Sequence, residues 1–98
     1  MALTIDREQN EIGALRNITD WRGKNVLEIG CGNGRLTRRL ARLGAQIEAI
    51  DPNPDLIRIA RQQLPRNFAP RVRFSVGKSS RLDYSKETFD QVVFAWSL

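Results

Sequence analysis

The chain has 98 residues, of which 41% are apolar and 28% are charged, and this predicts one small domain rather than a multidomain protein. No run approaches the roughly 18 apolar residues of a membrane span, and MALTIDREQN lacks the apolar core of a secretory signal. We therefore expect a cytoplasmic protein with no membrane partner. With one cysteine and no histidine, the sequence disfavours metal clusters and histidine-activated nucleophiles, so we expect no metal site.

The net charge of +5 arises from 16 basic and 11 acidic residues, and it favours anionic partners. Four of the basic residues share one face of a predicted helix at positions i, i+3, i+4 and i+7, namely Arg35, Arg38, Arg39 and Arg42. A nucleic-acid partner is one interpretation of this stripe. A solvated helix face is the more common one, because no aromatic residue is interleaved with the arginines for base stacking.

The first predicted element is an amphipathic helix over about residues 5–18, where isoleucine and leucine recur at helical spacing. A short apolar strand is expected over residues 26–29. Three glycines follow within residues 30–34, and then a helix whose leucines recur at i, i+4 and i+7 until Gly44. The predicted order is therefore strand, glycine loop, helix.

A second strand is expected over residues 46–51, followed by a helix that Asn53 caps and that ends before Pro65. Residues 65–70 are predicted to form a loop. Residues 72–76 alternate apolar and polar side chains, which is typical of an edge strand, whereas residues 92–96 form the continuous apolar run of a buried strand. Right-handed crossovers between these strands would make the sheet parallel.

The glycine loop has the form acid-x-G-x-G-x-G, in Glu28-Ile29-Gly30-Cys31-Gly32-Asn33-Gly34. Glycines between a strand and a helix let the backbone approach a ligand, and the helix N-terminus favours negative charge. A dinucleotide fingerprint would need a glycine where this chain has Arg35, which disfavours a nicotinamide cofactor. A second acid, Asp51, ends the next strand, where a carboxylate can accept both hydroxyls of a ribose.

These residues resemble the class I S-adenosylmethionine-dependent methyltransferases over VLEIGCGNGRLTRRLARLGAQIEAIDPNPDLIRIARQQL, VRFSVG and FDQVVFAWSL, about residues 24–98. The resemblance implies an α/β domain with a Rossmann-like three-layer fold. With the helix predicted over about residues 5–18 before it, we expect a single domain over residues 1–98. Its four-stranded, mainly parallel sheet would have the order 3-2-1-4, half of the seven-stranded methyltransferase sheet.

The resemblance also implies S-adenosylmethionine as cofactor and assigns its contacts. Those to its methionine part would come from Glu28, Gly30, Cys31, Gly32 and Gly34. Asp51 would hold the ribose hydroxyls, and Pro52 and Asn53 would lie near the adenine. Where the family commonly has an acid that bonds the adenine amino group, this chain has Lys78 and Ser79, so these two are expected as altered adenine contacts.

Each assignment has a structural alternative. The three glycines could simply form a tight strand-to-helix turn, and Asp51 could begin a turn that helps to cap the next helix. Glu28 could bond backbone N–H groups of its own loop instead of serving the cofactor. Cys31 is interpreted as a small packed residue, because no histidine is available to activate its thiol.

The sequence stops after the fourth predicted strand, whose outer neighbour in the family's sheet is therefore missing. We expect either a homodimer that pairs these strands, through Val92, Val93, Phe94 and Trp96, or a truncated piece of a longer enzyme. The predicted function is methyl transfer to an unidentified, small-molecule acceptor, and the sequence assigns no catalytic base. A cofactor-binding module without turnover and a basic nucleic-acid-binding domain are the alternatives.

Overall fold

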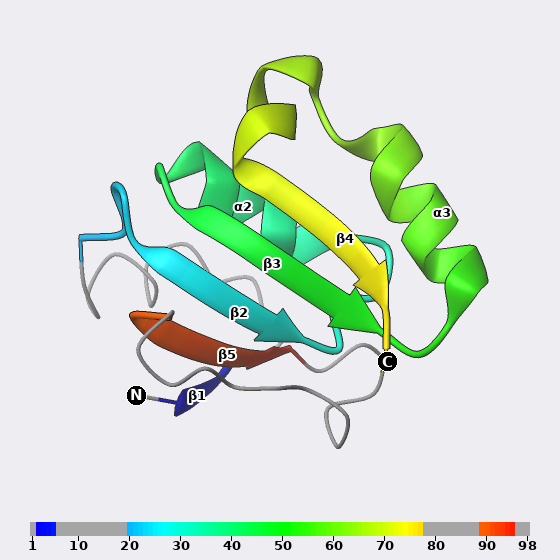
Figure 1. The fold of residues 1–98 in the computed structure, drawn as a ribbon, viewed down its shortest axis with the longest axis horizontal. Helices are drawn as coiled ribbons and strands as arrows, with labels where there is room; N and C mark the ends of the chain where they lie inside the picture. The colour runs from blue at the N-terminus through cyan, green and yellow to red at the C-terminus, as the bar shows by residue number, and fades with distance from the viewer. Residues whose placement is uncertain (1, 6–19, 78–88, 96–98) are drawn as a thin grey trace.

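The computed structural model describes residues 2–5, 20–77 and 89–95 of the chain. These residues form one five-stranded parallel sheet with the order β1-β5-β2-β3-β4 (Figure 1). The strands are β1 (Ala2–Ile5), β2 (Asn25–Ile29), β3 (Gln46–Asp51), β4 (Val72–Val76) and β5 (Gln91–Ala95). The expected four-strand order is confirmed, because the second, third, fourth and fifth strands correspond to the family order 3-2-1-4 when they are read from β4 inwards.

Two α-helices and one 3-10 helix connect these strands, namely α2 (Arg35–Arg42), α3 (Pro54–Gln63) and η1 (Arg66–Arg71). Both α-helices cover the same face of the sheet (Figure 1), as two successive right-handed crossovers require. The Asn53 side chain accepts hydrogen bonds from the N–H groups of Asp55 and Leu56, and Pro54 occupies the first turn. The predicted cap of this helix is therefore confirmed. Residues 66–71 form η1 instead of the expected irregular loop.

The core lies between the sheet and the two helices. Helix α2 contributes Leu36, Leu40 and Ala41, and α3 contributes Ile57 and Ala60. The sheet and its flanks contribute Trp21, Val26, Ala45, Ile47, Ala49, Phe74 and Val93, together with Cys31 of the glycine loop. Because this core fixes the ends of β2 and β3 against α2, it also fixes the loop that joins β2 to that helix.

The burial of β4 follows the alternating pattern of its residues only at the middle of the strand. Phe74 faces the core at 6% exposure between the exposed Arg73 and the half-buried Ser75, whereas Val76, which follows Phe74 on the same face, is 52% exposed at the end of the strand. The opposite edge of the sheet differs from the prediction that the last strand has no outer neighbour. Strand β5 does not lack an outer neighbour, because β1 pairs with it in parallel from Ala2↔Val92 to Ile5↔Ala95.

This pairing corrects two expectations. Ile5 ends strand β1 and does not begin a helix, since its backbone pairs with Ala95 of β5. The rest of the expected N-terminal helix, residues 6–19, lies outside the described residues, as does Trp96. A homodimer that pairs two copies of β5 would need β1 to leave that edge, and the dimer itself stays a prediction. Within the described ranges no helix is long and apolar enough to cross a membrane.

Candidate functional site

The glycine loop begins where β2 ends and is tied directly to the end of the neighbouring strand. The N–H groups of Gly30 and Cys31 both donate to the Ile50 carbonyl of β3, at 2.9 and 3.0 Å. Gly30, Gly32 and Gly34 all have positive φ angles, of 80, 57 and 85°. These conformations favour glycine over any residue with a Cβ atom.

Two of these glycines also leave room for neighbouring parts of the protein. A Cβ atom on Gly30 would lie 2.8 Å from the Ala95 carbonyl oxygen of β5, closer than packing allows. A Cβ atom on Gly34 would lie 3.1 Å from the Phe74 ring and 3.2 Å from the Ala60 methyl group. The turn therefore needs glycine at both positions for internal packing, whether or not a ligand approaches the loop.

The Asp51 carboxylate, at the end of β3, binds both the glycine loop and the turn before α3. It is 6% exposed and accepts a hydrogen bond from the Gly32 N–H at 2.9 Å through Oδ2. Its Oδ1 accepts from the Asn53 N–H, also at 2.9 Å. Asp51 therefore holds the glycine loop and also begins the turn that leads into α3.

The residues after Asp51 serve the next helix. Pro52 and Asn53 are exposed, and the Asn53 side-chain oxygen is engaged by the first turn of α3. The Gly77 N–H donates to the Asp51 backbone carbonyl at 3.0 Å, which attaches the end of β4 to the same place. Lys78 and Ser79, the two expected adenine contacts, lie outside the described residues.

Glu28 lies inside the protein, on the face of β2 that α2 covers. Its side chain is fully buried, and Oε1 accepts a hydrogen bond of 2.5 Å from the Thr37 hydroxyl. Thr37 is also fully buried and was not singled out by the sequence analysis. The sequence does carry an indication of its role, because Thr37 is a polar residue beside Leu36 on the apolar face of α2. A polar side chain in that position needs a buried hydrogen-bond partner.

Cys31 packs against the core at 5% exposure. Burial, and then the nearby negative charges of Glu28 and Asp51, raise the pKa of the Cys31 thiol well above its ordinary value. The thiolate is the reactive form, so this cysteine is a packing residue and not a nucleophile. The raised pKa of the thiol therefore agrees with the interpretation of Cys31 as a packed residue, which the sequence suggested because no histidine is available to activate it.

The arrangement matches the general position of ligand sites in open α/β sheets. The chain runs from β2 to β3 and β4 on one side and then crosses to β5 on the other, so the sheet reverses its order between β2 and β5. Ligands bind outside the carboxyl ends of strands at such a point. Gly30 lies there, against Ala95 at the end of β5.

The site can accept the hydroxyls of a ribose. A carboxylate offers about four acceptor positions, and Asp51 uses one on each oxygen for the Gly32 and Asn53 N–H groups. Each oxygen can therefore accept one further hydrogen bond. A residue set with a fixed carboxylate and a glycine loop at the carboxyl edge fits a nucleoside-bearing cofactor such as S-adenosylmethionine.

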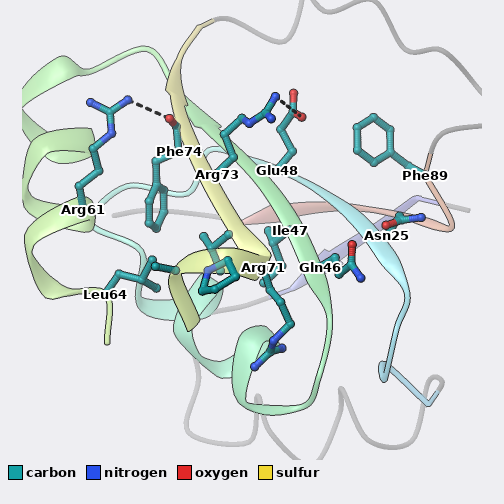
Figure 2. Close-up of a pocket in the computed structure, with 13 residues that line it drawn as sticks. Asn25, Gln46, Ile47, Glu48, Arg61, Leu64, Arg71, Arg73, Phe74 and Phe89 are labelled. Carbon is teal, nitrogen blue, oxygen red and sulfur yellow. Dashed lines mark hydrogen bonds and ion pairs between the residues drawn. The ribbon is translucent and has the colours of Figure 1, made fainter. Parts of the chain in front are cut away.

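A hollow lies away from this site, beside the edge strand β4 (Figure 2). Its volume is about 710 Å³, and it is lined by the amino ends of β2 and β3, including Asn25 and Gln46. Arg61 within it donates to the Phe74 carbonyl at 2.9 Å, and Arg73 lies 4.0 Å from Glu48 (Figure 2). No residue of the glycine loop lines it, so we do not assign the chemistry to this hollow.

Comparison with known proteins connects this geometry with one family. The family described as "Methyltransferase domain" matches residues 26–98. The magnesium-protoporphyrin O-methyltransferase of Rhodobacter capsulatus is 42% identical over 79 residues, 81% of this chain and 34% of that protein. The mitochondrial ubiquinone biosynthesis O-methyltransferase of Mus musculus is 40% identical over 76 residues, 72% of this chain and 20% of that protein. The chain thus spans about a third or less of the length of these two relatives.

Solved structures have the same fold. An RNA methyltransferase from Salinibacter ruber, in complex with S-adenosylhomocysteine, matches with a TM-score of 0.77 at 24% identity, over 92% of this chain and 60% of that one. The magnesium protoporphyrin IX methyltransferase of Synechocystis PCC 6803, with S-adenosylhomocysteine bound, matches with a TM-score of 0.72 at 24% identity, over 85% of this chain and 37% of that one. At these identities the likeness concerns the fold.

Proposed function

This chain belongs to the methyltransferase domain family of class I, S-adenosylmethionine-dependent enzymes, and we propose that it binds this cofactor for methyl transfer to an oxygen atom of a small molecule. The observation that carries the proposal is the hydrogen bond from the Gly32 N–H to the Asp51 carboxylate, which joins the glycine loop after β2 to the carboxyl end of β3. The proposed ribose contact and the proposed methionine contacts therefore lie side by side.

Different residues of the site are proposed to contact different parts of the cofactor. Asp51 accepts the ribose hydroxyls, because its two oxygens each retain an acceptor position. The glycine loop, with Gly30, Cys31, Gly32 and Gly34, lies along the methionine part, and Glu28 supports that loop from inside the protein. Pro52, Asn53, Lys78 and Ser79 are the proposed adenine contacts.

When bound, the sulfonium of the cofactor supplies an activated methyl group. The protein's part in such a transfer is chiefly to hold the two reactants in line. Glu28 and Thr37 serve that purpose indirectly, because their buried hydrogen bond fixes α2 relative to the end of β2. The chain contains no histidine, so an acceptor hydroxyl cannot lose its proton to an imidazole of this chain.

An oxygen acceptor is supported by two relatives. Both the Rhodobacter capsulatus protein and the Mus musculus protein are named as O-methyltransferases, and both share at least 40% of aligned residues with this chain. Their names refer to small molecules, magnesium-protoporphyrin and ubiquinone. We therefore propose a small molecule with a reactive oxygen as the acceptor class for this chain.

Calorimetric titration with S-adenosylhomocysteine tests cofactor binding, with NAD as the competing ligand. We expect saturable binding of S-adenosylhomocysteine alone. Asp51→Asn removes the charge that would accept the ribose hydroxyls, so affinity should fall by about 10- to 100-fold, the equivalent of a lost charge-assisted hydrogen bond. Asp55→Asn is the matched control, because Asp55 is an exposed acid on α3.

Thermal unfolding of each variant separates loss of binding from loss of folding. If a folded wild-type chain fails to bind S-adenosylhomocysteine, or binds NAD equally well, the proposal is wrong. Release of S-adenosylhomocysteine from S-adenosylmethionine, in the presence of phenolic or carboxylic acceptors, then tests transfer itself. Cofactor binding without any turnover would instead support the alternative of a binding module.

A further inference from the structure

The sheet has two outer strands among the described residues, β1 and β4, and a side chain from a helix reaches the outer edge of β4. Nη2 of Arg61, on α3, donates a 2.9 Å hydrogen bond to the backbone carbonyl of Phe74 in the middle of that strand. Figure 2 shows the side chain extending from the helix to this carbonyl. The acceptor is a backbone group of the kind that a neighbouring strand uses for pairing.

The Phe74 carbonyl points away from the rest of the sheet. The Gly77 N–H, just after β4, donates to the Asp51 carbonyl of β3, so the backbone N–H of Gly77 points into the sheet. Successive residues of a strand turn their backbone groups to opposite sides, and Val76 and Phe74 therefore alternate outward and share the outer edge. An edge of this kind is a template for pairing with another strand.

There is open space beside β4 for an additional strand. The hollow of about 710 Å³ runs along this edge, and its lining includes Val72, Arg73 and Phe74 of the strand together with Arg61 and Leu64 of α3. Paired strands lie only about 4.8 Å apart, so a strand added here would lie in this hollow. Within the described ranges no strand occupies the outer edge of β4.

The residues of β4 are compatible with pairing to a second copy of the same strand. In an antiparallel pair centred on Phe74, Val72 of one copy lies opposite Val76 of the other. Arg73 then lies opposite Ser75, so no two like charges face each other across the pair. Val76 is 52% exposed, and this pairing would cover it with an apolar neighbour.

The central hydrogen bonds of such a pair are the ones that Arg61 prevents. Two copies paired about Phe74 would exchange N–H to carbonyl bonds at this residue, because its backbone groups point outward. In the present structure the carbonyl instead accepts from Arg61 of its own chain. The Val72 N–H is also engaged, with the Ala69 carbonyl of η1. Formation of the pair must therefore break one Arg61 bond in each copy.

We propose that the outer edge of β4 is a pairing surface for β4 of a second copy of this chain, and that Arg61 restrains this pairing by holding the Phe74 carbonyl. This surface is distinct from the edge of β5, which β1 occupies. Charged side chains on an edge strand are one way in which proteins limit strand addition. If Arg61 served only to attach α3 to the sheet, its removal would lower stability and leave self-association unchanged.

Light scattering over a range of protein concentrations tests the proposal on the full chain. Arg61→Met keeps the apolar stem and removes the donor, so two bonds no longer have to break for each dimer. We expect this variant to dimerise at roughly a tenth of the concentration that the wild-type chain needs, or less. Arg61→Lys should change association less, because an ammonium group still donates. Circular dichroism shows whether each variant folds, and Arg61→Gln is a second replacement if the methionine variant does not.

The matched control is Arg58→Met, which removes the same charge from an exposed position of the same helix, 3.9 Å from Asp55. It should leave self-association unchanged. Adding Val76→Pro to Arg61→Met removes an outward N–H group from the edge and should restore the wild-type behaviour. A folded Arg61 variant that associates no more than the wild type would overturn the proposal. So would equal effects of the Arg58 and Arg61 variants, which would indicate net charge, or a dimer that Val76→Pro leaves intact, which would indicate another interface.

Discussion

The Thr37 hydroxyl donates a 2.5 Å hydrogen bond to Oε1 of Glu28, and both side chains are fully buried. The bond joins the middle of α2 to the strand that precedes the glycine loop. A buried carboxylate needs such partners, because burial without hydrogen bonds is unfavourable for a charge. The loop between these two residues is thus fixed at both of its ends.

Replacing Thr37 tests that connection. Thr37→Val keeps the shape of the side chain and removes the donor, so the free energy of unfolding should fall by about 1–3 kcal/mol. Urea unfolding measures the change. Thr37→Ser keeps the hydroxyl and should recover most of the loss. If valine is as stable as threonine, the hydrogen bond does not hold the helix to the strand.

Gly34 should tolerate no side chain. Gly34→Ala places a methyl group about 3.1 Å from the Phe74 ring, at a φ of 85° that disfavours L-residues. Strain and overpacking together should lower the free energy of unfolding by about 2–5 kcal/mol.

Gly23→Ala is the control for this change. Gly23 has a φ of 71° but open space around its missing Cβ atom, so alanine there should cost only about 1–2 kcal/mol of backbone strain. The difference between the two variants, measured by urea unfolding, isolates the packing of Gly34. Equal losses would mean that Phe74 moves aside freely.

The Cys31 thiol should be slow to react in the folded protein. Its pKa is raised by burial and by the charges of Glu28 and Asp51, so at neutral pH and below it stays a thiol in the folded state. Labelling with a thiol reagent should be fast in denaturant and much slower in buffer at the same pH. Rapid labelling of the folded chain would show that the site opens readily.

Arg71 should matter more for stability than its exposed neighbour Arg66. Arg71 donates to two carbonyls at the end of α2, so Arg71→Met should lower the free energy of unfolding by about 1.5–3 kcal/mol. Arg66→Met removes an exposed side chain of the same 3-10 helix and should change stability by less than about 0.5 kcal/mol. Thermal unfolding compares the two, and equal effects would contradict the role given to the Arg71 contacts.

Strand β1 should control self-association through β5. It occupies the outer edge of β5, and removal of residues 1–5 would leave that edge unpaired. We expect the shortened chain to dimerise more strongly than the full chain, as measured by light scattering over a range of concentrations. A full chain that already dimerises with β1 in place would point to a different interface.

The local elements followed closely from the sequence. Strand β3 has the predicted bounds, and α3 begins at Pro54 behind its Asn53 cap as expected. These elements are encoded by short-range signals, such as apolar period, capping residues and glycines with positive φ, that act within a few residues. The glycine loop and Asp51 were predicted for the same reason, although their role in cofactor binding stays a prediction.

Contacts between distant segments were decided only by the tertiary structure. Nothing in the sequence near Gly34 indicates that Phe74 packs against it, or that Thr37 meets Glu28 on another element. The place of β1 beside β5 was missed because four residues carry too weak a pattern, and backbone pairing across the chain fixes them. In the same way, the arginine stripe follows from helical period alone, but only folding brings Phe68 to its side and makes a hollow.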